Sequence, residues 1–311
     1  MKRDAVVRPE CLVCSGSLGT HVKLPGLARC AACGFVTADM TISDEELEQL
    51  YTADYFHGKE YSNYILEAPT LRHNVELRLA TLAKHVENVR AKSLFEIGCA
   101  YGFFLDLARR SFARAEGVDI SEDAVRYARN TLGVAATKAS FLDEGVGEGF
   151  DVYCLWDTVE HLREPGRYIG KIASVIAPGG IVAITTGDIG SLNARMRGRR
   201  WRMIHPPSHL HYFSSQTLTR LLERHGFEVI TVEHPGVART LRMIITGVLL
   251  LGKPKARWRA GLASFANRLP FGDWSVSLNL FDIMYVIARK CRSSNREFCD
   301  APCRHHAKQL P

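Results

Sequence analysis

Apolar residues along the chain fall into two alternating patterns: short continuous runs, and longer stretches in which apolar positions recur every three or four residues. The short runs predict buried strands at 93–97, 114–118, 134–138, 151–155 and 181–186. The longer stretches predict amphipathic helices at 71–89, 102–111, 122–132 and 166–177. Because strands and helices alternate, we expect an α/β fold built on a mostly parallel sheet.

The pattern becomes less regular beyond residue 186. We expect a basic loop at 195–202, a helix at 217–225 capped by Ser214 or Ser215, a strand at 227–233, one or two helices within 238–270 and a last strand at 283–288. The apolar stretch 243–251 indicates a buried lid helix or, alternatively, an interfacial helix that reaches a lipid-linked substrate. No apolar run reaches the roughly 18 residues of a membrane span.

Small and acidic residues mark the ends of the first two expected strands. Gly98 and Gly102 follow the first strand and let the backbone approach a ligand closely. Asp119 ends the second strand, where a carboxylate suits the two hydroxyls of a ribose. Glu96 stands just before the loop, where it would repel a pyrophosphate but suits the cationic end of an amino-acid-like ligand. The pattern therefore disfavours a dinucleotide.

This segment resembles the first motif of the class I S-adenosylmethionine-dependent methyltransferases, Asp/Glu-x-Gly-x-Gly-x-Gly, with Ala100 in place of the middle glycine. The resemblance implies a Rossmann-like seven-stranded sheet with helices on both faces, the last strand antiparallel at the sheet edge, and S-adenosylmethionine as cofactor. Ser140 stands where the family commonly has an acid that touches the adenine amine. The cofactor-binding residues that the resemblance implies are Glu96, Gly98, Cys99, Ala100, Gly102, Phe103, Asp119, Ile120, Ser140, Phe141, Trp156 and Asp157.

Nine cysteines without an export signal indicate thiols or metal ligands rather than disulfides. Cys11 and Cys14 form one Cys-x-x-Cys pair, and Cys30 and Cys33 form a second after 15 intervening residues. This spacing is typical of a tetrahedral zinc site, and four sulfur ligands leave no open position for catalysis. We therefore expect structural Zn²⁺, with four free or redox-active thiols as the alternative. The arrangement resembles a bacterial group of methyltransferases in which such a module precedes the catalytic domain.

His161 is the first candidate for a general base, because imidazole titrates near neutrality and this residue follows the strand at 151–155. Glu160 beside it would hold the ring, although a capping or core histidine is the alternative. His209 and His211 lie in a proline-stiffened segment that matches the Pro-x-x-His-Leu-x-x-Phe pattern of the same bacterial group. We expect this segment to line the substrate pocket, unless it only closes the edge of the sheet.

A catalytic metal is a second interpretation of these residues. Asp157, Glu160 and His161, with His209 to complete the set, resemble the divalent-metal site of ubiquinone O-methyltransferases and small-RNA 2′-O-methyltransferases. We favour a metal-free His161 base, and the sequence does not decide between the two.

The chain has 311 residues, enough for one large α/β domain with attachments. The expected parts are a zinc-ribbon-like module at 1–42, a helical connector or lid at 43–92, the catalytic domain at 93–236, a helical lid with the last sheet strand at 237–290 and a flexible tail at 291–311. A charged N-terminus without an apolar stretch predicts a cytoplasmic protein, with peripheral membrane contact as an alternative. The oligomeric state is not determined by the sequence.

The net charge of +7 is concentrated in the last third, where residues 195–304 hold 19 Lys/Arg and 7 Asp/Glu. Such a region favours an anionic partner. We expect O-methylation of a small molecule or glycan, such as a sugar, a nucleotide sugar or a secondary metabolite. An RNA methyltransferase and a sugar C-methyltransferase are the alternatives. A non-enzymatic cofactor-binding regulator would need a degenerate cofactor motif, and the motif is intact.

Overall fold

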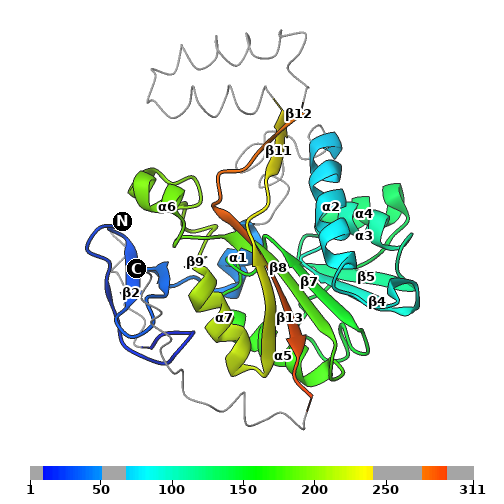
Figure 1. The fold of residues 1–311 in the computed structure, drawn as a ribbon, viewed down its shortest axis with the longest axis horizontal. Coiled ribbons are helices and arrows are strands. Elements are labelled where there is room, and N and C mark those ends of the chain that lie inside the picture. Colours follow the sequence, from blue (N-terminus) through cyan, green and yellow to red (C-terminus); the bar gives the residue numbers. More distant parts are fainter. Residues whose placement is uncertain (1–9, 51–67, 241–274, 293–311) are drawn as a thin grey trace, which may run out of the picture.

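The computed structural model describes residues 10–50, 68–240 and 275–292. Its centre is a seven-stranded sheet of order β10-β13-β8-β7-β4-β5-β6 (Figure 1). The strands are β4 Ser93–Ile97, β5 Arg114–Asp119, β6 Ala135–Lys138, β7 Val152–Trp156, β8 Ile181–Gly187, β10 Phe227–Glu233 and β13 Ile283–Lys290. Neighbours from β6 to β8 are parallel, which confirms the α/β prediction and the seven-stranded sheet.

The last strand is antiparallel, as expected, but its predicted place at the sheet edge is wrong. β13 lies between β8 and β10 and pairs antiparallel with both, so β10 forms the edge. An inserted strand forms backbone hydrogen bonds on both sides, whereas an edge strand leaves one side unpaired. The inner position is consistent with the apolar run in β13, from Ile283 to Ala288, which is buried throughout.

Helices cover both faces of the sheet, and strand side chains alternate between them. Helices α2 Ala68–Ala83, α3 Phe103–Ala108 and α4 Glu122–Leu132 contribute to the core on one face, together with Val152 and Cys154 of β7. Helices α5 Pro165–Val175 and α7 Ser215–Arg224 contribute to the core on the other, together with Tyr153 and Leu155. The two-residue period of a strand therefore divides the apolar side chains between two cores.

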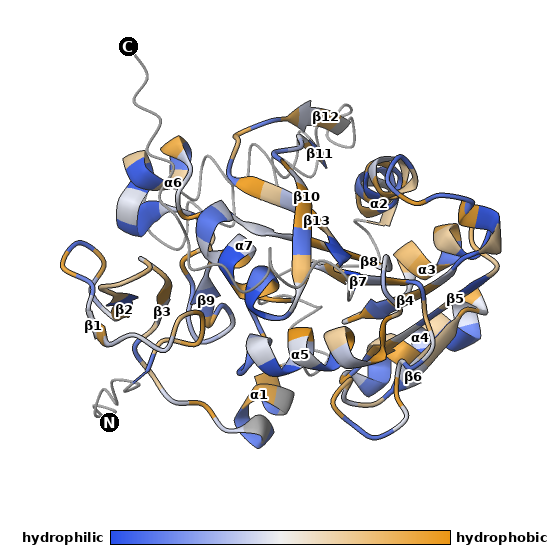
Figure 2. Ribbon diagram, turned by 60° about the horizontal axis from the view of Figure 1, so that its bottom comes forward, coloured by the Kyte–Doolittle hydropathy of each residue, from blue (hydrophilic) through white to orange (hydrophobic). Residues whose placement is uncertain are grey.

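The N-terminal module forms a small antiparallel sheet that takes a strand from far along the chain. Strands β1 Leu18–Thr20, β2 Leu27–Cys30 and β3 Val36–Ala38 are joined by β9 His211–Tyr212. Figure 2 shows this sheet on the opposite side of the molecule from β4, β5 and β6. Val13 and Phe35 are fully buried and belong to the same core as Leu221 of α7. The module and the catalytic domain thus share one hydrophobic core.

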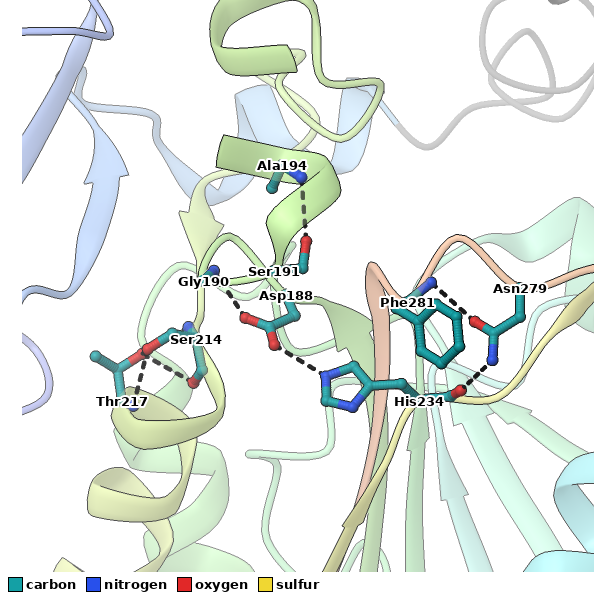
Figure 3. Close-up of polar contacts among 9 residues, drawn as sticks. All are labelled: Asp188, Gly190, Ser191, Ala194, Ser214, Thr217, His234, Asn279 and Phe281. Atoms are coloured by element: carbon teal, nitrogen blue, oxygen red, sulfur yellow. Dashed lines mark hydrogen bonds and ion pairs between the residues drawn. The ribbon is translucent and has the colours of Figure 1, made fainter. Parts of the chain in front are cut away.

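Side chains hold the turn that follows β8, as Figure 3 shows. One carboxyl oxygen of Asp188 accepts from the Gly190 N–H at 2.7 Å, and the other lies 3.0 Å from Nε2 of His234. The Ser191 hydroxyl accepts from the Ala194 N–H at 3.1 Å and begins helix α6 Leu192–Arg197. Helix η3 Gly198–Arg200 follows, so the prediction of a loop at 195–202 is wrong. A serine cap that satisfies a free helix amide favours the helix at this position.

Serine caps also begin two other helices, and the cap expected before the helix at 217–225 is confirmed. Ser214 caps α7, and its backbone N–H donates to the Thr217 hydroxyl at 2.9 Å, so Ser214 rather than Ser215 is the cap (Figure 3). Ser43 and Glu46 form the reciprocal hydrogen bonds of a capping box at helix α1 Asp44–Leu50.

The segment expected to hold the lid helices begins as a strand. β11 Val237–Thr240 pairs antiparallel with β12 Ser275–Leu278, so the expected helical stretch does not begin at residue 238. The rest of that stretch, including 243–251, lies outside the described residues, as do much of the connector at 51–67 and the tail from 293. None of the helices in the described ranges has the length and apolar composition needed to cross a membrane.

Asp282 provides a test of how the segment before β13 is fixed. It is 1% exposed and accepts from Trp201 Nε1 at 2.9 Å, Asn193 Nδ2 at 2.7 Å and Arg202 Nη2 at 2.8 Å. We expect Asp282→Ala to lower the free energy of unfolding by about 3 kcal/mol, because it leaves buried donors without an acceptor. Urea denaturation measures this. Asp123→Ala, which removes an exposed ion pair with Arg126, serves as control and should change stability by less than about 1 kcal/mol. Equal effects of the two changes would contradict the expectation.

Candidate active site

A cavity of about 630 Å³ opens where β4, β5 and β7 reach their carboxyl ends. This is the edge at which open α/β sheets bind ligands, and the volume lies within the usual range for small-molecule sites. Its lining includes thirteen residues that the sequence analysis singles out for cofactor or catalysis and that belong to the strand ends and the turns after them. They are Glu96, Gly98, Cys99, Ala100, Phe103, Asp119, Ile120, Ser140, Phe141, Trp156, Asp157, Glu160 and His161.

The loop after β4 is shaped by residues with positive φ. Gly98 has φ of +78° and Gly102 of +76°, and Ala100 adopts φ of 44°, a conformation that glycine accepts more readily. A Cβ on Gly98 would lie 2.7 Å from the Thr158 hydroxyl oxygen, and one on Gly102 would lie 2.9 Å from Cβ of Ala128. The loop therefore has space for backbone only, and Gly102 supports the loop without lining the cavity.

Asp119 holds this loop in place while still facing the cavity. One of its carboxyl oxygens accepts from the Ala100 N–H at 2.8 Å, and the other accepts from the Ser121 N–H at 2.9 Å. Burial raises the pKa of Asp119 above its ordinary value, and these amide donors act against the rise. Each carboxyl oxygen has more than one lone pair, so the side chain can also accept from hydroxyl groups of a ligand.

Glu96 is a buried carboxylate at the floor of the cavity. It is 3% exposed, and its Oε2 atom has no hydrogen-bond partner among the described residues. Burial raises its pKa well above the ordinary value, against the attraction of Arg78. A buried carboxyl oxygen without a partner costs free energy, so the site favours a ligand that brings a cationic donor.

The loop after β6 forms another wall. Phe141 is 1% exposed, lines the cavity and packs against Phe95 with ring centroids 5.9 Å apart. The Ser140 hydroxyl accepts from the Leu142 N–H at 3.1 Å, and the Ser140 N–H donates to Asp143 at 3.0 Å. Asp143 therefore shapes this turn together with Ser140.

The turn after β7 begins with a strained, ion-paired aspartate. Asp157 has φ of 49° and pairs with Arg78 of α2. Its other carboxyl oxygen accepts from the Thr185 hydroxyl at 3.0 Å. Burial alone would raise the pKa of Asp157, but the Arg78 guanidinium and the Thr185 hydroxyl lower it below the ordinary value. Asp157 is therefore an anion near neutral pH.

Glu160 and His161 end this turn. Glu160 is 1% exposed, and neither of its carboxyl oxygens accepts a well-formed hydrogen bond from the described part of the chain. Burial and the nearby Asp157 raise the pKa of Glu160 from 4.5 to about 8. Nδ1 of His161 lies 2.8 Å from the carbonyl oxygen of Ser208, which can only accept, so Nδ1 carries the proton. When the ring is neutral, Nε2 is its basic nitrogen.

Two further histidines pack against His161. The ring centroid of His209 lies 4.6 Å from that of His161 and 3.8 Å from that of His205. Burial lowers the pKa of all three imidazoles, of His205 to about 4. Nδ1 of His209 lies 2.9 Å from the Met203 carbonyl oxygen, which fixes its tautomer in the same way. The three imidazoles are therefore neutral at pH 7.

Glu160, His161 and His209 also have the donor set of a cation site. Each offers one ligand atom, and these atoms lie within 4.8 Å of one another. Imidazole and carboxylate together suit several divalent transition metals. Of the predicted set, Glu160, His161 and His209 come together, whereas Asp157 is not part of this group and pairs with Arg78. The proximity of the three alone does not distinguish a base from a metal site.

His211 lies elsewhere. It is 1% exposed and is absent from the cavity lining; Nδ1 faces the Thr37 hydroxyl at 3.0 Å and Nε2 faces the Arg163 carbonyl oxygen at 3.4 Å. His211 therefore bridges β3 and the turn after β7, and we do not place it among the groups that touch substrate.

The four module cysteines come together as the spacing predicts. Their sulfur atoms lie within 4.8 Å of one another, with Cys11 and Cys33 3.6 Å apart and Cys14 and Cys30 3.5 Å apart. A tetrahedral zinc ion with Zn–S distances of about 2.3 Å separates its sulfur ligands by about 3.8 Å. The observed separations fit that geometry closely.

Comparison with known proteins places this site in a family. The family model described as "Methyltransferase domain" matches residues 70–232, just over half of the chain. The chain belongs to this methyltransferase family. Ubiquinone biosynthesis O-methyltransferase of Neisseria meningitidis serogroup C is 27% identical over 129 residues, or 39% of this chain and 54% of the relative. The protein of the same name from Rhodopseudomonas palustris is 23% identical over 164 residues, or 50% and 65%. The chain spans about half the length of the first of these curated relatives.

Solved structures show the same fold. One chain of the complex between the Haloferax volcanii Trm112 methyltransferase activator and its provisionally assigned methyltransferase has a TM-score of 0.51 at 13% identity, covering 81% of this chain and 100% of that chain. A provisionally assigned methyltransferase from Bacillus halodurans has a TM-score of 0.50 at 14% identity, covering 69% and 99%. At such identities the similarity concerns the fold alone.

The cavity suits S-adenosylmethionine, the cofactor that the sequence resemblance implies. The unpartnered oxygen of Glu96 suits the ammonium of the methionine moiety. Asp119 suits the ribose hydroxyls, and Gly98 lines the same cavity. Phe141 offers an apolar wall for an adenine ring.

Sequence reasoning missed Arg78 and Thr158. Arg78 lies on the helix that was expected only to pack against the sheet, yet its guanidinium pairs with Asp157 and lies 5.7 Å from the Trp156 ring centroid. Nothing in the helical pattern distinguishes this arginine from a solvated one, because 79 residues separate it from its partner. Thr158 faces Gly98 and explains why that position excludes a side chain.

A substitution at Asp119 tests the cofactor-binding part of the cavity. We expect Asp119→Ala to weaken S-adenosylhomocysteine binding about 10- to 100-fold, because it removes both the ribose acceptor and the support of the Ala100 amide. Isothermal titration calorimetry measures the affinity. Asp123→Ala, at an exposed acid in the first turn of α4, should leave the affinity within about twofold. A wild-type affinity for Asp119→Ala would exclude the assigned role.

Glu160 predicts a pH dependence of stability. Its folded pKa is about 8 against an ordinary 4.5, so between these values the folded state retains a proton that the unfolded state has released. The Glu160 contribution to stability is therefore present below about pH 4.5 and lost as pH rises through about 8. In the presence of a chelator, urea unfolding should show wild type losing stability relative to Glu160→Gln as pH rises from 5 to 9. A constant difference would contradict the raised pKa.

Proposed function

We propose that the enzyme transfers a methyl group to a hydroxyl oxygen of a small molecule or glycan, with His161 as general base. The single observation that carries this proposal is the hydrogen bond from His161 Nδ1 to Ser208, which directs the proton-accepting capacity of the neutral ring to Nε2. His161 lines the same cavity as Glu96 and Asp119. The curated relatives are named O-methyltransferases, which supports oxygen over carbon as the acceptor atom.

The proposed roles follow from the contacts. Bound S-adenosylmethionine supplies an electrophilic methyl group on a sulfonium. Glu96 and Asp119 orient the ligand at its ammonium and ribose ends. His161 takes the proton of the acceptor hydroxyl at Nε2 as the oxygen becomes nucleophilic, and the anionic Asp157 stabilises the resulting imidazolium. The low pKa of the neighbouring His205 and His209 keeps them uncharged, so they do not compete for this proton at pH 7.

A divalent cation is the second candidate for acceptor activation. The proximity of Glu160, His161 and His209 supports it, since their ligand atoms lie within 4.8 Å. Such an ion would polarise the acceptor hydroxyl, and His161 would then act as a ligand rather than a base.

RNA is the second candidate for the acceptor. The α6–η3 segment exposes Arg195, Arg197, Arg199 and Arg200, with no acid among the residues between them, which favours a phosphate-bearing partner. Binding to such a partner would weaken steeply with salt. The relatives are named for ubiquinone biosynthesis, which supports a small-molecule acceptor over RNA, and we rank the two in that order.

The four cysteines are proposed to hold structural Zn²⁺. Support comes from the sulfur separations of 3.5 and 3.6 Å, which suit a tetrahedral ion.

The base is tested with His161→Ala. We expect its kcat to fall about 100-fold or more while S-adenosylhomocysteine affinity is unchanged, because the ring acts on the acceptor and not on the cofactor. Transfer of tritiated methyl from S-adenosylmethionine to a catechol, a nucleotide sugar and total RNA measures both activity and acceptor class. His73→Ala, at an exposed histidine of α2, is the matched control and should retain full activity.

Two outcomes would overturn the base assignment. Full activity of His161→Ala would exclude any role in proton removal. Loss of wild-type activity in chelator with the four-cysteine site still loaded, and recovery on addition of a divalent ion, would favour the cation instead.

A further inference from the structure

The two-residue strand β9 lies between the four-cysteine module and the proposed catalytic turn. On one side, the backbone N–H groups of Leu210 and His211 both donate to the carbonyl oxygen of Glu160, at 2.9 and 3.1 Å. His161 itself is bonded to Ser208, just ahead of β9. The segment that contains His161 is therefore hydrogen-bonded at Glu160 and His161 to β9 and the residues just before it.

On its other side, β9 pairs with β3 of the module. Thr37 is opposite His211 in the register, and the Ala38 N–H donates to the Leu210 carbonyl oxygen at 2.8 Å. β3 follows directly on the second cysteine pair, where the Cys30 N–H donates to the Phe35 carbonyl oxygen at 2.8 Å. The Phe35 ring centroid lies 5.6 Å from that of His211. Contacts therefore run without interruption from the cysteines to β9.

Two side chains complete this connection. Nε2 of His211 faces the carbonyl oxygen of Arg163, which can only accept, so Nε2 carries a proton. The Thr37 hydroxyl donates to the Leu210 carbonyl oxygen at 3.0 Å and also lies 3.0 Å from Nδ1 of His211. His211 is 1% and Thr37 2% exposed, so bulk water cannot replace a lost hydrogen bond there.

We propose that Thr37 and His211 are positioning residues that couple the four-cysteine module to the turn carrying Glu160 and His161. His211 bonds the carbonyl groups of residues 160 and 163, which flank the proposed base, and Thr37 bonds His211 and the Leu210 carbonyl oxygen. The module thus supports the proposed catalytic turn through β9, although none of residues 10–42 lines the cavity. This inference deepens the proposed function and rests on it for the role of His161.

The test compares Thr37→Val, Thr37→Ser and Arg224→Met in the full-length enzyme. Valine has nearly the shape of threonine but no hydroxyl, whereas serine retains the hydroxyl. Arg224 of α7 donates to the Val13 carbonyl oxygen, so its loss removes a contact between module and domain that does not run through β9. Circular dichroism and calorimetry with S-adenosylhomocysteine verify that each variant is folded and binds the cofactor product.

For Thr37→Val we expect the amides of Leu210 and His211 to exchange hydrogen about tenfold faster. The ¹⁵N-imidazole N–H signal of His161, visible because Ser208 protects it, should weaken or vanish. The kcat with the accepted substrate should fall about tenfold, while KM for S-adenosylmethionine stays within about twofold. Thr37→Ser and Arg224→Met should retain the wild-type exchange rates, imidazole signal and kcat.

Equal effects of Thr37→Val and Arg224→Met, or an unchanged His161 signal in Thr37→Val, would overturn the coupling. The exchange and imidazole measurements need no acceptor and do not depend on proton removal. If His161→Ala remains fully active while Thr37→Val alters exchange, the proposed base is wrong and the coupling stands. If His161→Ala is inactive and Thr37→Val has wild-type exchange, the coupling is wrong and the base stands.

Discussion

The main constraint on this molecule comes from four acidic side chains that share one cavity. They lie at the carboxyl ends of three neighbouring parallel strands and in the turn after β7. Glu96, Asp119, Asp157 and Glu160 all line one cavity, where burial disfavours their charged forms. Asp119 is compensated by backbone amides and Asp157 by Arg78. Glu96 and Glu160 retain carboxyl oxygens without well-formed partners in the described chain, and these are the two points at which we assign ligand chemistry.

Each half of the proposed reaction holds one compensated and one uncompensated acid. Glu96 and Asp119 lie on adjacent strands β4 and β5 and form the cofactor end. Asp157 and Glu160 belong to β7 and its turn, next to the histidines. Arg78 connects the halves, since its charge lowers the pKa of Asp157 and opposes the rise for Glu96. A helix outside the cofactor motif thereby determines the charge state of the site.

The N-terminal module contributes to this site through packing as much as through its cysteines. Its apolar residues are too few for a core of their own, and Val13 and Phe35 are buried in a core shared with α5 and α7. Its sheet is completed by β9, which carries the hydrogen bonds to Glu160. A boundary drawn at residue 42 on the basis of composition therefore separates residues that fold together.

Local and periodic signals in the sequence determined most of the fold. The apolar runs located β4, β5, β7, β8 and β10, and the expected helix at 122–132 has the bounds of α4. Glycine spacing and the acid after β5 located the cofactor loop, because backbone sterics and strand ends are local properties. Cysteine spacing located the four sulfurs, since a knuckle holds its ligands close together in the chain. Only the tertiary structure decided the place of β13 inside the sheet, the pairing of Arg78 with Asp157 and the position of His211 between β3 and the catalytic turn. Each of these joins residues at least 48 positions apart, or places strands by the partners that satisfy their backbone, and neither periodicity nor motif spacing encodes such a contact.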